Sequence, residues 1–526
     1  MKNGLRGAAA MAWFAACAAT QAAGTLTVCT EASPDGFDVA QSTSAVTNDA
    51  AGNTIYDQLL IRKRGSTEIV PGLAERWELS PDGLQYTLHL RRGVKFHTTP
   101  WFTPTREMNA DDVVFSIRRL MDRDSPWRKA APNGFIAWES YGMADLVKAI
   151  DKLDEMTVRF TLRRPSAPFP SDLAQWNTAS IYSAEYGARL LASGQPGLLN
   201  TQPVGTGPFL LRSYQKDAVI RYLPHAGYWG GAPTLDALIF AITPDASVRI
   251  QRLKAGECLV GSNMRAETID SLAGTPIDAP GKTALLIGYI VLNHKKPFLS
   301  DRRFREALRL AFDQKSFIQS VYNGKAEPAT SFLPPVQWGF DATLSRRFDP
   351  ERARALVKAS GYDGTEFAIA TRIGGSIDGK RAAELMQSDW ARIGVRTRVQ
   401  MMEWGEMLKR SGRGDYDITF LNWAATGDPD NYLTPNLSCA AIEGGGNRSR
   451  WCSKDFDALI DAARANSDRA QRIALYAKAQ RMIDEEVALI PTVYPQYFTA
   501  VNRRVKGFIH SPTTDLDFRG VSVGPH

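Results

Sequence analysis

The sequence predicts an α/β protein built of two or three lobes. The chain has 526 residues, more than a single hydrophobic core usually supports, and 44% of them are apolar, an ordinary share for a soluble protein. Segments with strand periodicity alternate with segments of helix periodicity along the chain. No internal repeat or low-complexity tract is visible.

Strands are predicted where apolar residues alternate between turn residues. The clearest are 85–90 (QYTLHL), 157–162 (TVRFTL) and 209–222. Helices are predicted where a capping residue precedes an apolar-periodic run. Asn109 opens a run through Leu120, and Asp301 opens RRFREALRLAF. Further helices fit 350–360, 380–393 and 470–486.

The first 22 residues have the composition of a secretory signal peptide. A basic start is followed by an apolar run from Gly7 to about Ala19 and by small residues around Ala22, after which we expect cleavage. A lipid anchor at Cys17 is the weaker interpretation, because Phe14 is an unusual first residue for that motif. No later segment reaches the roughly 18 apolar residues of a membrane-spanning helix. The mature chain is expected to be exported.

The charge and the cysteine content indicate which partners and which covalent bonds to expect. The net charge of +7 is a mild excess without a dense basic run, so no nucleic-acid partner is expected. Removal of the signal takes Cys17 and leaves four cysteines, an even number that favours disulfides in an exported protein. Three pairings are possible. Short spacing favours Cys439 with Cys452, which leaves Cys29 with Cys258.

Known catalytic and metal motifs are missing from the sequence. There is no G-x-S-x-G, no H-E-x-x-H and no credible Cys-His pair, and the six histidines are scattered. No cysteine pair has the C-x₂₋₄-C spacing of a zinc site. An exported hydrolase is therefore the weaker hypothesis, and we expect neither a metal nor a cofactor.

The segment TGDPDN (426–431) can be interpreted as a turn or as a ligand site. Asp-Pro and Gly-Asp pairs form turns, because proline fixes φ and a short carboxylate bonds nearby amides. Its composition alone favours the turn.

Several long motifs resemble one family in the same order along nearly the whole chain. They include GLAERWELSPDGLQYTLHLRRGVKFH (72–97), WFTPTREMNADDVVFSIRRLMDRDSPW (101–127), PVGTGPF (203–209) and EWGE (403–406). The chain is similar to the extracellular solute-binding proteins of family 5. Within that family it resembles most the dipeptide-binding proteins and the binding protein of the antimicrobial-peptide-sensitivity transporter.

This resemblance implies a bilobal periplasmic binding protein fold with an extra subdomain. Lobe I would comprise 23–53, 201–283 and 499–526, the extra subdomain 54–200, and lobe II 284–498. Crossing segments near 287–293 and 496–500 would form the hinge. The family also has the two disulfides favoured above. The implied function is capture of short peptides by lobe closure. A monomer would then deliver them to inner-membrane permease subunits with cytoplasmic ATPases.

The resemblance also implies ligand-binding residues. Thr43, Ser44 and Ala45 match a stretch whose backbone can pair with an extended peptide. Trp404 matches a tryptophan that packs beside the ligand. Dipeptide binders hold the ligand's ammonium with an aspartate three residues after a tryptophan. Here the tryptophan is Trp423 and the third residue is Thr426, which cannot neutralise a cation. Asp428 is the alternative amine-binding acid, or only a turn residue.

A second departure concerns the arginine loop that holds the ligand carboxylate. Here it is replaced by a shorter glycine-rich loop, and no arginine matches directly. Residues 374–380 (GGSIDGK) have phosphate-loop spacing, but Arg381 follows where Ser or Thr should bind magnesium, so a nucleotide site is rejected. The loop and helix start could still hold an anion with Arg372, Lys380 or Arg381. Both departures leave room for a non-peptide solute such as haem or a metal chelate.

Overall fold

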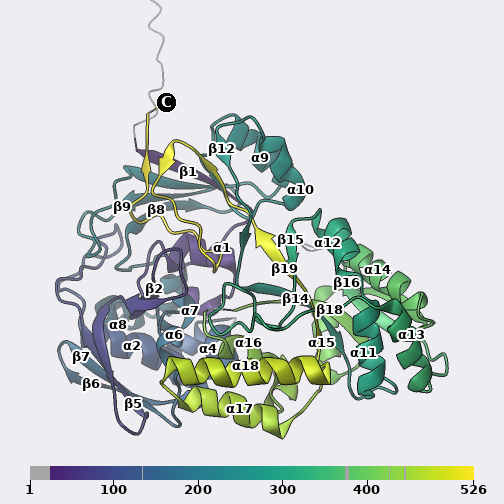
Figure 1. Cartoon of the computed structure of the whole chain (residues 1–526). Coiled ribbons are helices and arrows are strands. Elements are labelled where there is room, and N and C mark those ends of the chain that lie inside the picture. The colour runs from purple at the N-terminus through teal and green to yellow at the C-terminus, as the bar shows by residue number, and fades with distance from the viewer. Residues whose placement is uncertain (1–23, 133, 374–377, 426, 444–445, 526) are drawn as a thin grey trace, which may run out of the picture.

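The computed structural model describes residues 24–132, 134–373, 378–425, 427–443 and 446–525. In these ranges the backbone forms two seven-stranded sheets, a four-stranded antiparallel sheet and shorter strand pairs, with helices packed around them (Figure 1). None of the helices in these ranges is both long enough and apolar enough to cross a membrane.

The first large sheet joins segments that are far apart in the sequence. β1 (Thr25–Thr30) runs parallel to β10 (Ala237–Ile242) and to β11 (Val260–Gly261). β20 (Ala500–Asn502), near the C-terminus, pairs with β11. The sheet is completed by β8 (Phe209–Gln215), β9 (Val219–Pro224) and β12 (Ile277–Asp278). We call the body around this sheet lobe I.

The run 209–222 is a hairpin and not one strand. β8 and β9 pair antiparallel, from Phe209 opposite Pro224 to Gln215 opposite Val219. Asp217 lies between them with a φ of 59°, a left-handed conformation that aspartate tolerates in tight turns. The apolar alternation continues on both sides of this turn, which is why the sequence pattern did not reveal the break.

The extra subdomain has the predicted strands and helix. β5 (Gln85–Leu90) and β7 (Thr157–Leu162) are central in the sheet β4-β5-β7-β6, whose outer strands are β4 (Ala74–Leu79) and β6 (Val147–Asp154). α2 (Ala110–Met121) begins at the predicted cap, where the Asn109 side chain accepts from the Asp111 amide. Leu88 and Phe160 belong to the same buried cluster as Leu26 and Val28 of β1. The subdomain therefore shares its core with lobe I.

The second large sheet forms lobe II, with helices on both faces. Its central strands are β14 (Leu286–Leu292) and β18 (Ile418–Ala424), and β16 (Phe367–Arg372) runs parallel to β18 and β17 (Thr397–Met402). At the other edge are β13 (Lys282–Thr283), β15 (Ala326–Pro328) and β19 (Ile490–Tyr497).

Two apolar clusters lie on opposite faces of the lobe II sheet. The first includes residues of α11 (Arg302–Ala311), α12 (Gln314–Tyr322), α13 (Pro350–Ala359) and α14 (Gly379–Ala391). The second includes residues of α16 (Asp430–Leu437), α17 (Lys454–Ala465) and α18 (Arg469–Glu486). The helices predicted after Asp301 and at 350–360, 380–393 and 470–486 are thereby confirmed to within a few residues.

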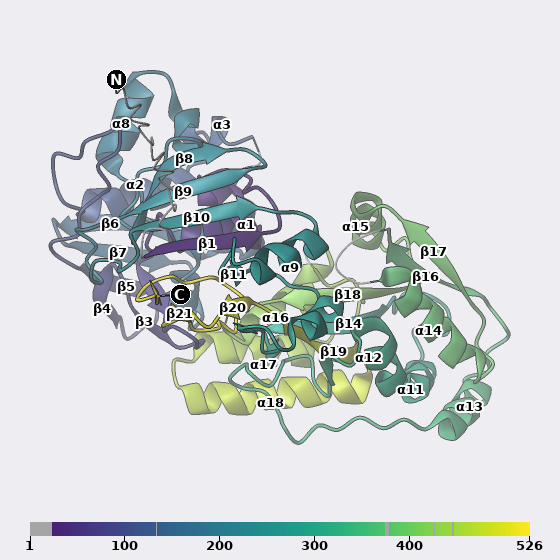
Figure 2. The same cartoon turned by 90° about the horizontal axis from the view of Figure 1, so that it is seen from above.

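The chain crosses between the sheets twice, and one crossing differs from the prediction. Residues 279–281 connect β12 of lobe I to β13 of lobe II, and residues 498–499 connect β19 to β20. The predicted first hinge, 287–293, falls largely within β14, which is paired on both sides by β18 and β19. A strand paired on both sides cannot absorb a hinge rotation. Figure 2 shows the two large sheets side by side, joined through this region.

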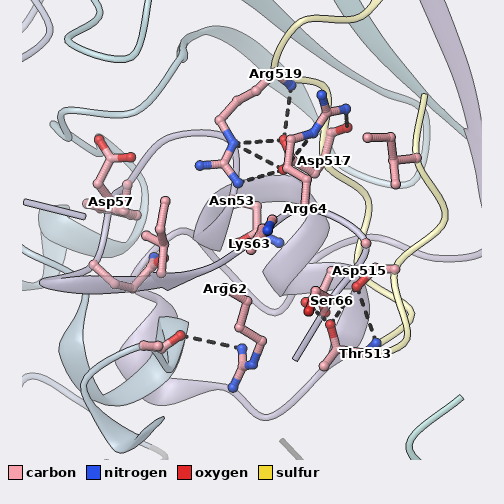
Figure 3. A pocket seen from close by; sticks show the side chains of 17 residues that line it. Asn53, Asp57, Arg62, Lys63, Arg64, Ser66, Thr513, Asp515, Asp517 and Arg519 are labelled. Carbon is pink, nitrogen blue, oxygen red and sulfur yellow. Dashed lines mark hydrogen bonds and ion pairs between the residues drawn. The ribbon is translucent and has the colours of Figure 1, made fainter. Parts of the chain in front are cut away.

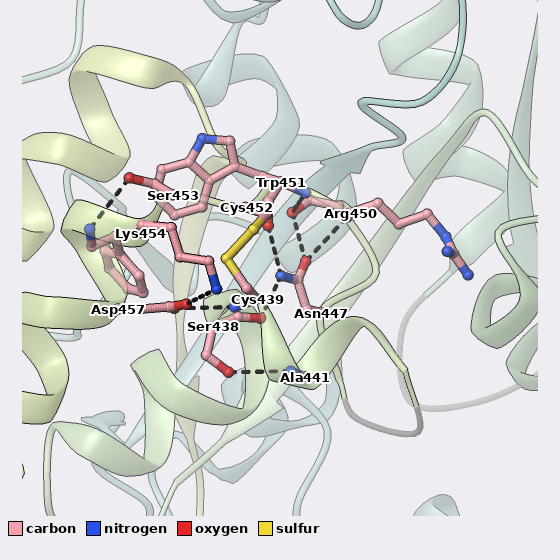
Figure 4. Close-up of a disulfide and its surroundings, with 12 residues drawn as sticks. Ser438, Cys439, Ala441, Asn447, Arg450, Trp451, Cys452, Ser453, Lys454 and Asp457 are labelled. Atoms are coloured by element: carbon pink, nitrogen blue, oxygen red, sulfur yellow. Dashed lines mark hydrogen bonds and ion pairs between the residues drawn. A yellow bond between two sulfur atoms is a disulfide. The ribbon is translucent and has the colours of Figure 1, made fainter.

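Both disulfides favoured by the sequence are present. Cys29 of β1 is bonded to Cys258, just before β11, so the bridge ties two neighbouring segments of lobe I. Cys439 is bonded to Cys452 and closes a loop in lobe II (Figure 4). Inside that loop the side-chain Nδ2 of Asn447 donates to the backbone carbonyls of Ser438 at 2.9 Å and Trp451 at 2.8 Å.

Candidate functional site

The ends of parallel strands from both lobes meet in the region between them. In lobe I, the carboxyl ends of β1, β10 and β11 lead into Glu31, Thr243 and Ser262. In lobe II, β16, β17 and β18 end at one edge, where β14 begins and β19 ends. Ligands of α/β proteins bind beyond the carboxyl ends of such strands. Both edges are therefore suited to hold one ligand.

A cavity of about 320 Å³ lies between these two edges. Glu31, Arg249 and Asn263 line it from lobe I, and Tyr322 and Asn422 from lobe II. Residues 495–498, at the end of β19 and the start of the crossing to lobe I, also line it. Because each wall belongs to a different lobe, the shape of this cavity depends on how the lobes are placed. Its volume lies in the range of small-molecule sites.

The carboxylate of Glu31 is held by three neutral donors. It accepts from Ser262 Oγ at 2.6 Å, Asn263 Nδ2 at 3.2 Å and Thr30 Oγ1 at 3.4 Å. Arg249 is buried and donates to the carbonyls of Thr243 and Pro244, each at 2.8 Å, and of Asn263 at 3.3 Å. Burial lowers the pKa of the Arg249 guanidinium, and Glu31 partly opposes that effect. A carboxylate and a guanidinium are thus fixed in one wall.

The stretch Thr43 to Ala45 begins a helix. Thr43 and Ala45 are exposed, and Ser44 precedes α1 (Ala45–Thr47), which continues into η2 (Asn48–Gly52). The Ser44 amide donates to Ser42 Oγ at 3.0 Å, and its carbonyl accepts from the Asn48 amide at 3.1 Å. The Ser44 amide is therefore already used within the chain and does not offer a donor for a strand-like pairing in this conformation. Contact of this stretch with ligand stays a prediction.

Trp423 and Asp428 already have partners within lobe II. The Trp423 indole donates to the Asn431 carbonyl at 2.9 Å. Asp428 is 4% exposed and accepts from Arg472 Nη2 at 2.8 and 2.9 Å. It also accepts from the Asp430 amide at the start of α16. Its carboxylate thus has a buried cationic partner, with which a ligand ammonium would have to compete.

For the other predicted ligand residues the structure gives a position in an element or no position at all. Arg372 is the half-buried last residue of β16. Trp404 is the first residue of α15 (Trp404–Arg413), where the Glu403 carboxylate accepts from the Gly405 amide at 2.7 Å. Thr426 and residues 374–377 of the glycine loop lie outside the described residues. Asp378 caps α14, which places Lys380 and Arg381 in the first helical turn.

Two other hollows are not shared between the two lobes. A cavity of about 50 Å³ lies between the start of the extra subdomain and residues 509–519 (Figure 3). Its volume suits water molecules only. Arg519 pairs there with Asp517 at 2.6 Å, and Arg64 with Asp517 at 3.3 Å. A groove of about 750 Å³ lies on lobe II alone, between α12 and residues 346–348.

No group of three His, Cys, Asp or Glu side chains in the described ranges is arranged to hold a metal ion.

Sequence reasoning missed Glu31, Arg249, Asn263 and Tyr322. None of the four lies in a strand or helix that was predicted from the sequence. The available signal was topological, since a polar residue directly after a buried parallel strand often faces a ligand. That signal required knowing that β1, β10 and β11 are neighbours.

A family model matches residues 68–444 of the chain, that of the bacterial extracellular solute-binding proteins, family 5 (middle region). The chain belongs to this family. A family 5 relative, di/tripeptide-binding protein 4 of Pseudomonas aeruginosa (strain UCBPP-PA14), is 46% identical over 520 residues. That match covers 97% of each chain.

Two solved structures show that this similarity includes the fold of the chain. HbpA2 from Haemophilus parasuis has a TM-score of 0.89 and 36% identity, over 95% of this chain and 100% of that one. A dipeptide-binding protein from Pseudoalteromonas sp. SM9913, in complex with Met-Leu, has a TM-score of 0.81 and 34% identity. Its match covers 95% of this chain and 100% of that one.

Proposed function

We propose that this chain is the periplasmic substrate-binding component of an ATP-driven importer and captures short peptides by lobe closure. The observation that carries the proposal is the cavity between the carboxyl ends of parallel strands of both lobes, next to a segment where the chain crosses between them. A relative named as a di/tripeptide-binding protein and a similar structure holding Met-Leu support a peptide as the solute.

The mechanism needs binding energy and no covalent step. A ligand favours the closed state only by contacts that are better there than in the open state. Contacts made to both walls of the cavity satisfy that condition, because they are complete only when the lobes are together. The closed protein, acting as a monomer, would then present the peptide to inner-membrane permease subunits.

The predicted ligand residues remain part of this proposal. Thr43, Ser44, Ala45, Arg372, Trp404, Trp423, Thr426 and Asp428 would surround the peptide around the strand ends. Support differs among them, since Ser44 and Asp428 already have bonds within the chain.

The test combines calorimetry with small-angle scattering on the mature chain. Dialanine or Met-Leu should raise the midpoint of thermal unfolding and lower the radius of gyration. Recovery of the intact dipeptide afterwards separates a binding protein from a peptidase. If haemin stabilises and compacts the protein while neither dipeptide does, the solute is not a peptide.

A further inference from the structure

The groove on lobe II has a partly apolar lining. Phe348 is 51% exposed, and Pro328 lines the same groove. Lys315, Ile318 and Gln319 of α12 also line it, and their spacing of three and four residues places them on one face of the helix. The volume of about 750 Å³ lies within the range of small-molecule sites. The groove can therefore hold the apolar body of a small ligand.

The charged side chains of the groove lining are mostly positive. Asp313 is the one acid among the described residues of the lining, and its side chain is used to cap α12. Arg347 pairs with Asp349 at 3.1 Å. Lys315 and Arg346 also line the groove, and neither forms an ion pair within the described ranges. The groove therefore has two positive charges that are not balanced by a direct partner.

Arg346 is the more unusual of these two cations, because it is half-buried and its guanidinium makes no hydrogen bond to a described residue. Burial lowers its pKa to about 10, and the positive charge of Arg309 adds to that effect. The acids Asp484 and Glu306 oppose the shift, but both are already paired with Arg309. A guanidinium has five N–H donors, and leaving buried donors without an acceptor costs free energy. A carboxylate beside Arg346 would supply the missing acceptor and the missing charge.

We propose that the groove on lobe II is a second binding site, which takes an amphiphilic carboxylic acid and holds its carboxylate at the Arg346 guanidinium. Lys315 adds a second positive charge to the same lining, and Phe348 offers its exposed ring to the apolar body of the ligand. Charge complementarity favours an anion, since a guanidinium binds a carboxylate through two parallel hydrogen bonds. None of these three residues lines the cavity between the lobes, so the inference is independent of the proposed peptide-binding function.

Two pairs of ligands, each an acid and its neutral amide, test the inference. Octanoate is compared with octanamide, and 3-phenylpropionate with 3-phenylpropanamide, by NMR titration of the mature chain. The acid of at least one pair should bind about 10-fold more tightly than its amide, because charge-assisted hydrogen bonds are stronger than neutral ones. Arg346→Gln should remove most of that preference, and Lys315→Gln should reduce it. Phe348→Ala should weaken acid and amide alike.

Lys358→Gln is the matched control, since Lys358 is an exposed cation of α13 outside the groove lining. It should leave the preference unchanged. Arg346→Lys keeps the positive charge and should keep part of the preference, which separates loss of the charge from a failure to fold. Equal affinity for acid and amide in both pairs, no binding of either acid, or a full preference in Arg346→Gln would overturn the inference. So would displacement of the bound acid by dialanine, because the acid would then occupy the cavity between the lobes.

Discussion

At the scale of single residues, Asp428 is a predicted ligand-binding residue whose side chain is used in a buried ion pair of the fold. Sequence register places it near the cleft, where an acid could hold an ammonium. In the structure it pairs with Arg472, and the side chains are only 6% and 8% exposed. Arg472 lies 44 residues further along, on α18, and no local pattern in the sequence connects the two.

Asp428→Ala should lower the free energy of unfolding by about 3 to 5 kcal/mol, because it leaves the Arg472 guanidinium buried without its partner. Urea unfolding without ligand measures this. Asp278→Ala is the control, since Asp278 pairs with Arg503 in an exposed position at the surface, and its loss should leave the free energy of unfolding almost unchanged. Unchanged stability combined with weaker binding of dialanine would instead support the ligand role.

At the scale of elements, the sequence predicts those helices and strands whose positions depend on residues close together in the chain. Helix starts at Asn109 and Asp301 follow from side-chain caps that act within three residues. The strands β5 and β7 follow from alternation. The sequence did not predict the first crossing between the lobes, because β14 is identified as a central strand only by its pairing with β18 and β19. Glu31 was missed for a similar reason, since Ser262 lies 231 residues away.

The loop between Cys439 and Cys452 is the element whose stability is most directly testable. The bridge spans 13 residues of sequence, for which the chain-entropy model gives about 3 kcal/mol. The double variant Cys439→Ser with Cys452→Ser should lose about that much free energy of unfolding. Asn447 should continue to bond Ser438 and Trp451, so the loop would keep part of its order. A variant as stable as the oxidised wild type would contradict the prediction.

At the scale of the whole molecule, the extra subdomain contacts lobe II near Asp428 and Asp430. The Ala167 amide donates to the Arg464 carbonyl of α17 at 2.7 Å. Asp172, at the end of α6 (Phe169–Asp172), is 5% exposed close to this contact. Its pKa is raised well above the ordinary range by burial, then by Asp428 and Asp430 of lobe II, while Arg464 and Arg62 oppose the shift. The contact between subdomain and lobe thus contains a carboxyl group that favours its protonated form.

This arrangement predicts a pH dependence with a definite sign. A carboxyl whose pKa is raised by folding contributes its full stability below its unfolded pKa, near 3.8, and loses it as pH rises through the folded value. Asp172→Asn should therefore raise the unfolding midpoint at pH 7 relative to wild type, and the two proteins should converge towards pH 4. Asp82→Asn is a control of opposite sign, because hydrogen bonding from Ser80 lowers the pKa of the exposed Asp82. That variant should be slightly less stable than wild type at pH 7. Urea unfolding between pH 4 and 8 measures all three proteins. If the urea midpoint of Asp172→Asn at pH 7 is lower than that of wild type, the ionised form of Asp172 stabilises the contact between the extra subdomain and lobe II.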